Sequence, residues 1–117
     1  MTNSIVVQLD LAVINMDAMV NFYENVLGIN FDKIDMNGVI LYSGKMGETA
    51  LNLVPNEIVG VEAQKSRHQL EVLVTDLKDA LARTVEFKGT IGEEYPGGKQ
   101  ALVYDPDDNN LVLIQNK

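Results

Sequence analysis

Hydrophobic and polar residues alternate near the start of the chain. Within residues 5–13, Leu9 and Leu11 fall on one face of an extended backbone, and Gln8 and Asp10 fall on the other. A period of two indicates a β-strand with one buried face. We therefore expect a strand whose leucine side packs into the core and whose polar side is left uncovered.

The spacing of the apolar residues then changes to that of a helix. Asn15 is a good N-cap, apolar side chains recur every three or four positions through residues 16–27, and Gly28 ends the pattern. After the helix, turn residues divide the chain into short apolar runs, which indicate strands. These extended segments are expected at 29–34, 38–43 and 48–54.

The whole pattern then returns. The QLDLAV run of residues 8–13 reappears as QLEVLV at 69–74, and LNL at 51–53 reappears as LVL at 111–113. Self-similarity of this kind indicates one supersecondary unit used twice. The second copy is expected to hold a strand at 68–74, a helix at 76–88 and extended segments near 90–94, 99–104 and 110–115.

The repeat predicts a single α+β domain over residues 1–117. Its two βαβββ units cover about 4–55 and 67–117, and a linker of about 56–66 joins them. One such unit cannot cover its own sheet, so the strands of both units should form a cupped mixed sheet with the helices on the convex side. The concave face is then left to hold a ligand.

Composition narrows the function classes. The chain has 117 residues, no cysteine and a net charge of -8, and no apolar run approaches the ~18 residues of a membrane span. An acidic chain does not favour nucleic acid or an anionic membrane. The first residues, MTNS, lack the basic and apolar stretches of a secretory signal. A cytoplasmic location is therefore expected.

Two motifs resemble those of a known superfamily. Residues 17–31 contain Phe22-Tyr23 followed by Val26-Leu27-Gly28, and residues 101–109 read ALVYDPDDN. At this spacing they resemble the signatures of the vicinal oxygen chelate superfamily, which includes glyoxalase I, bleomycin-resistance proteins and extradiol dioxygenases. The resemblance implies a homodimer with one cavity per pair of units. It leaves open whether the units pair within a chain or between chains.

The resemblance also implies where a metal would bind. In metal-dependent members, the four ligand positions correspond to Gln8, Asn52, Gln69 and Val112 of this sequence. Divalent metals prefer imidazoles and carboxylates, so we expect no metal cofactor, with a weakly bound divalent metal ion as the alternative. His68, the only histidine, shares a strand face with Leu70 and is expected to be structural, although metal binding by it stays open.

The expected concave face has the composition of a small-molecule site. Asp10 and Glu71 are equivalent in the repeat and could act as acid or base, bind a cationic ligand, or remain solvated or paired with Arg67 or Lys99. The expected ligand-binding residues are Gln8, Asp10, Tyr42, Asn52, Gln69, Glu71, Tyr104 and Val112.

Three functions are compatible with these residues. The first is a metal-free small-molecule binder of the bleomycin-resistance type, in which amides orient the ligand and carboxylates attract positive charge. The second is a lyase or isomerase that uses a carboxylate base or a weakly bound divalent metal. The third is a domain that acts through protein partners and whose cavity has no ligand.

Overall fold

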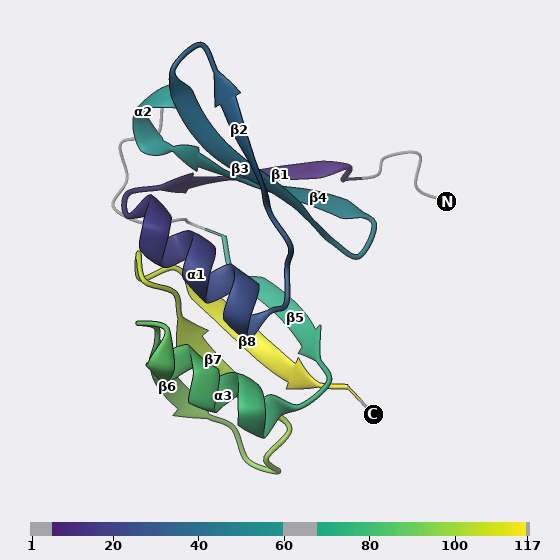
Figure 1. Cartoon of the computed structure of the whole chain (residues 1–117). Coiled ribbons are helices and arrows are strands. Elements are labelled where there is room, and N and C mark those ends of the chain that lie inside the picture. The colour runs from purple at the N-terminus through teal and green to yellow at the C-terminus, as the bar shows by residue number, and fades with distance from the viewer. Residues whose placement is uncertain (1–5, 60–67, 117) are drawn as a thin grey trace.

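The computed structural model describes residues 6–59 and 68–116 and contains the two expected units (Figure 1). The first unit comprises β1 (Gln8–Val13), α1 (Met16–Val26), β2 (Asp32–Met36), β3 (Val39–Met46), β4 (Thr49–Pro55) and α2 (Asn56–Val59). The second comprises β5 (Leu70–Val74), α3 (Leu77–Glu86), β6 (Thr90–Glu94), β7 (Gln100–Tyr104) and β8 (Asn110–Gln115). Arg67 and most of the expected linker lie outside the described residues.

Each unit forms a four-stranded mixed sheet with the same topology. The strand orders are β1-β4-β3-β2 and β5-β8-β7-β6. The first and last strands of each unit, β1 with β4 and β5 with β8, pair in parallel, and the other pairs are antiparallel. The repeated βαβββ organisation and the α+β class predicted from the sequence are thus confirmed.

Several expected boundaries differ from the structure. The second strand occupies 32–36 rather than 29–34 because Ile29 belongs to the end of the helix. The Ile29 N–H donates to the Tyr23 carbonyl, Gly28 has φ +70°, and the Ile29 side chain is buried. A glycine with positive φ just after the last helical turn commonly ends a helix in this way. β3 ends at Met46 rather than at 43, and β5 starts at Leu70 rather than at 68. The short helix α2 lies at the start of the expected linker.

The helices and the inner faces of the two sheets enclose one core. Figure 1 shows α1 between the two sheets and α3 over the second sheet, and α1 contacts both β4 and α3. Met19 and Phe22 of α1 have no exposed surface, and neither do Leu53 of β4 and Leu113 of β8. Within the described residues, no helix is long and apolar enough to cross a membrane.

Strand alternation leaves the other side of each sheet turned away from this core. We call this side the open face. Its central row comprises Asp10, Asn52 and Ser43 in the first sheet and Glu71, Val112 and Leu102 in the second. It corresponds to the concave face expected from the sequence.

Candidate ligand-binding site

On the first sheet, the open face carries a hydrogen-bonded polar cluster. Asp10 of β1 lies directly beside Asn52 of β4, and Ser43 of β3 lies on the other side of Asn52. The Oδ1 atom of Asp10 accepts hydrogen bonds from Gln8 Nε2 at 2.9 Å and from Asn52 Nδ2 at 3.0 Å. The next row along the sheet holds Gln8, Ala50 and Lys45.

This cluster leaves one buried acceptor unused. A carboxylate only accepts hydrogen bonds, so the amide of Asn52 has to turn its Nδ2 toward Asp10. That orientation directs Asn52 Oδ1 away from Asp10. This oxygen is buried and has no hydrogen-bond partner within the part of the chain that the structure describes. An unpaired buried acceptor costs about 1–3 kcal/mol, so it calls for a physical explanation.

On the second sheet, the equivalent row is mostly apolar. Glu71 lies beside Val112, and Leu102 lies on the other side of Val112. Glu71 is exposed, whereas Val112 is only 4% exposed. Tyr104 lies on the same face, two residues along β7 from Leu102, and pairs with Asn110.

Two other expected site residues lie elsewhere. Tyr42 pairs with Leu53, so it faces the core rather than the open face, and it packs there as a half-buried side chain. Its assignment to the concave face is therefore wrong, because the pairing register places Ser43 there instead. Gln69 precedes β5 and is exposed.

A small cavity marks the seam between the two sheets. Its volume is about 80 Å³, and its walls include Leu9 and Asp10 of β1, Leu70 of β5, and Asn110 of β8. His68 also lines it, and the His68 side chain is largely exposed. Leu11, Tyr23 and Leu51 line it as well, so the cavity lies on the core-facing side of the sheets, and Asp10 and Asn110 border it.

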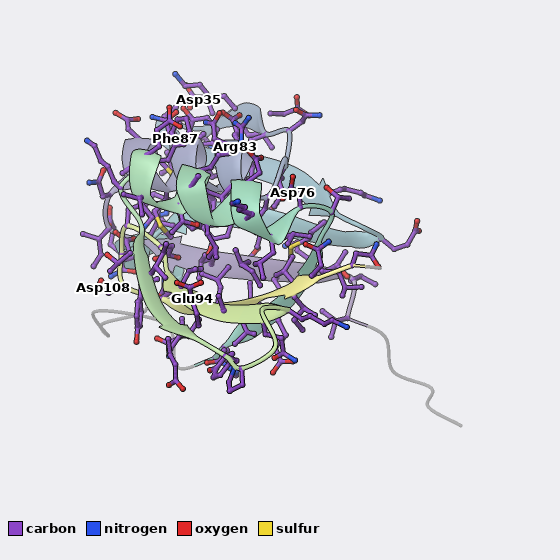
Figure 2. All side chains as sticks on the ribbon, turned by 90° about the horizontal axis from the view of Figure 1, so that it is seen from below. Asp35, Asp76, Arg83, Phe87, Glu94 and Asp108 are labelled. Carbon is purple, nitrogen blue, oxygen red and sulfur yellow. The ribbon has the colours of Figure 1, made fainter. Side chains whose placement is uncertain are left out.

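The described residues contain no group of three or more His, Cys, Asp or Glu side chains placed to hold a metal ion. An ion pair joins Arg83 to Asp79 at 2.9 Å on α3, where Figure 2 labels Arg83. Within these residues, neither Asp10 nor Glu71 is therefore paired with Lys99. Asp10 and Glu71 are exposed on the open face, and so is Asp32, which pairs with Ser43 in the same row as Asp10.

A second polar cluster, buried behind the seam, joins the two units. Asp105 is 1% exposed, and its carboxylate accepts four hydrogen bonds. The Tyr23 hydroxyl of α1 donates one at 2.8 Å, the Asp107 N–H donates another, and Asn109 donates through its N–H and its Nδ2. We call these residues, Tyr23, Asp105, Asp107 and Asn109, the interlock.

The interlock also holds the start of α1. The N–H groups of Ile14 and Asn15 donate to the two carboxylate oxygens of Asp107 at 2.7 and 3.2 Å. Asn15 caps the same helix by accepting from the Ala18 N–H, as the sequence predicts. The two sequence signatures therefore meet in space. Sequence reasoning identified these aspartates only as part of the second signature and missed this contact.

Burial shifts the ionisation of two interlock residues. Desolvation raises the pKa of Tyr23 well above its ordinary value, and the nearby Asp105 charge adds to that shift. Desolvation also raises the pKa of Asp105, although the hydrogen bonds from Asn109, Tyr23 and Asp107 partly oppose it. Tyr23 therefore stays a neutral donor at physiological pH.

The raised pKa of Asp105 makes its contribution to stability depend on pH. The folded protein holds this proton to a higher pH than the unfolded chain, so the contribution is greatest below the ordinary carboxyl pKa and is lost as pH rises through the raised value. The other carboxylates are the same in the wild type and in Asp105→Asn, so their pH-dependent contributions to stability cancel when the two proteins are compared. The destabilisation by Asp105→Asn, measured by urea unfolding, is expected to shrink between about pH 4 and pH 7. A cost that grows over this range would contradict the direction.

The chain is an α+β protein built from two repeated βαβββ units. The repeat helices α1 and α3 pack on the core side of the sheets, and the open face lies on the other side. Residues 5–113 match the model of the Glyoxalase/Bleomycin resistance protein/Dioxygenase superfamily. The chain therefore belongs to this superfamily, as its two signatures indicate. No curated protein sequence matches the chain.

Solved structures share the fold over nearly the full chain. Glyoxalase I of Leishmania major has 22% identity and a TM-score of 0.74, covering 97% of this chain and 87% of that one. The antibiotic binding protein TnmS3 of Streptomyces sp. CB03234 has 24% identity and a TM-score of 0.70, covering 100% and 99%. The fosfomycin resistance protein FosX of Mesorhizobium loti has 14% identity and a TM-score of 0.73, covering 100% and 94%. Likenesses at these identities establish the fold alone.

Proposed function

We propose that this chain binds a small molecule on its open face without a metal ion, in the manner of a bleomycin-resistance protein. The observation that carries this proposal is the cluster of Gln8, Asp10 and Asn52 with its unused acceptor. Asp10 attracts a cationic group, and a movement of the Asn52 side chain on binding lets the buried Oδ1 accept a hydrogen bond from that group. The ligand thereby satisfies an oxygen that the chain leaves unpaired.

The family to which the chain belongs supports a ligand-binding role. One structural neighbour is described as an antibiotic binding protein and another as a fosfomycin resistance protein. The net charge of -8 adds a long-range attraction for cations. A rigid, hydrogen-bonded carboxylate is a better receptor than a mobile one because less conformational freedom is lost on binding.

The metal-dependent alternative fits these residues poorly. Gln8 and Asn52 direct their amide nitrogens at Asp10, and Val112 offers no ligand atom. A divalent cation would find one exposed carboxylate and neutral amides there, which is a weak donor set. The lyase or isomerase alternative needs a carboxylate base held beside a bound substrate, and both Asp10 and Glu71 are exposed.

A binding experiment with an organic cation tests the proposal. We expect 1-naphthylmethylammonium to bind the wild type in isothermal titration calorimetry, and Asp10→Asn to weaken binding by about tenfold or more, because a charge-assisted hydrogen bond is lost. Asp108→Asn is the matched control. It removes the same charge from an exposed turn residue (Figure 2) with φ +66°, where asparagine is tolerated. Equal affinity for Asp10→Asn and the wild type would overturn the proposal.

The proposal keeps two expectations from the sequence as predictions. They are a homodimer and a cytoplasmic location. One chain has a mass of 12.9 kDa. Light scattering of a homodimer would give twice this mass.

A further inference from the structure

We propose that the Asp10 site on the open face selects an ammonium head group over a guanidinium, and that Gln8 sets this preference. The inference rests on the proposed function and specifies the chemical class of the cation. It follows from the way in which neighbouring side chains occupy one oxygen of the Asp10 carboxylate and leave the other oxygen open.

Both amide donors of the cluster use the same oxygen of Asp10. Gln8 Nε2 lies 2.9 Å from Asp10 Oδ1, and Asn52 Nδ2 lies 3.0 Å from it. Among the residues that the structure describes, none donates a hydrogen bond to Asp10 Oδ2. A carboxylate has about four acceptor positions, two on each oxygen. Oδ1 is therefore filled, whereas Oδ2 keeps both of its positions for a ligand.

The strand register places both donors beside Asp10. Gln8 lies two residues before Asp10 on the same face of β1, and Asn52 is the direct partner of Asp10 on β4. Both amides therefore come from strands of the sheet rather than from a loop. Asp10 itself is exposed, so a ligand in solution can reach its open oxygen.

Two other carboxylates on the open face lack this arrangement. Asp32 lies on β2 at the far end of the row that contains Asp10, and Glu71 lies beside Val112. Val112 is the counterpart of Asn52 in the repeat and has no amide to donate. Within the described part of the chain, neither Asp32 nor Glu71 accepts a hydrogen bond. Of these three carboxylates, only Asp10 has one oxygen filled and one open.

Organic cations differ in how they bind a carboxylate. A guanidinium presents two parallel N–H groups in one plane, and its strongest pairing places one of them on each carboxylate oxygen. At Asp10, this fork would have to displace Gln8 or Asn52 from Oδ1, and a guanidinium bound to Oδ2 alone would lose one of its two hydrogen bonds. An ammonium is a compact donor that can bind Oδ2 without displacing either amide. The filled oxygen therefore discriminates against a planar, two-point cation.

Isothermal titration calorimetry at pH 7 with two matched probes tests this inference. The probes are 1-naphthylmethylammonium and 1-naphthylmethylguanidinium, which carry the same charge and the same apolar group. We expect the wild type to bind the ammonium about tenfold more tightly, which is the effect of one charge-assisted hydrogen bond. Gln8→Ala opens an acceptor position on Oδ1, so the preference should fall to about twofold or less.

Gln100→Ala is the matched control for Gln8→Ala. Gln100 is exposed on β7 and pairs with Ile114 on the open face of the second sheet. The change thus removes an exposed amide from an equivalent surface without touching Asp10. This variant should keep the preference of the wild type for the ammonium. A circular dichroism melt of each variant confirms that it is folded.

The outcomes separate this inference from the proposed function. If the wild type binds the guanidinium as tightly as the ammonium or more tightly, the selectivity is overturned and the cation site remains. An unchanged preference in folded Gln8→Ala, or the loss of both probes, would show that Gln8 does not act by filling Oδ1 and would also overturn the inference. No binding of either probe to the wild type would overturn both proposals.

Discussion

Asp105→Ala is expected to lower the free energy of unfolding by about 3–5 kcal/mol at pH 7, because it breaks a buried hydrogen-bond network. The carboxylate accepts four hydrogen bonds, and alanine would leave their donors without an acceptor. Asp105 is 1% exposed and Asn109 is 3% exposed, so water has little access to replace the lost acceptor. Equilibrium urea unfolding, followed by circular dichroism, measures the change.

Tyr23→Phe provides a graded comparison for this prediction. It removes one donor and leaves the other three hydrogen bonds of Asp105 in place, so its cost should be about 1–3 kcal/mol. If Asp105→Ala costs no more than Tyr23→Phe, the network does not hold the units together as the contacts suggest. A cost of Asp105→Ala below about 1 kcal/mol would contradict the prediction outright.

The interlock gives a structural reason for the two sequence signatures. The first signature supplies Tyr23 from α1, and the second supplies Asp105 and Asp107 from the turn between β7 and β8. Residues that are distant in sequence thus form one contact between the repeated units. The same turn positions the start of α1 and, through β8, the open-face residue Val112.

Strand alternation was sufficient to predict most of the fold. Asp10 and Asn52 were placed on one face from their positions in the repeat, and the register pairs them directly. Alternation works here because one side of each strand is apolar, and a shift of one residue would bury the polar side. The leucines at 51, 53, 111 and 113 are all buried, as such a register requires.

Tyr42 shows where this reasoning stops. An aromatic residue with a polar end suits either a core or a site, and residues 39–46 have no strict alternation to decide between them. Only the pairing with β4 places Tyr42 opposite Leu53. The interlock and the unused Asn52 oxygen were equally hidden, because each depends on contacts between separate strands or units rather than on local pattern.

Phe22→Ala is expected to be as damaging as the loss of Asp105, with a cost of about 3–5 kcal/mol in the free energy of unfolding. Phe22 has no exposed surface. Its ring makes an edge contact with Tyr23, with the centroids 5.2 Å apart. It comes from the first unit but lies against Gly89 of the second, so its removal would leave a cavity between the units. Phe87→Ala, at the half-buried end of α3, should cost less.

The contact between Phe22 and Gly89 makes this prediction specific. A Cβ atom at Gly89 would lie 2.5 Å from Phe22 Cε1 and 2.7 Å from the Tyr104 carbonyl oxygen, so Gly89→Ala should itself destabilise the fold. In the Phe22→Ala background, the first clash disappears and the second remains. The double variant should therefore be more stable than the sum of the two single changes predicts, which urea unfolding of all four proteins would measure. Strict additivity would show that the two units do not meet at this contact.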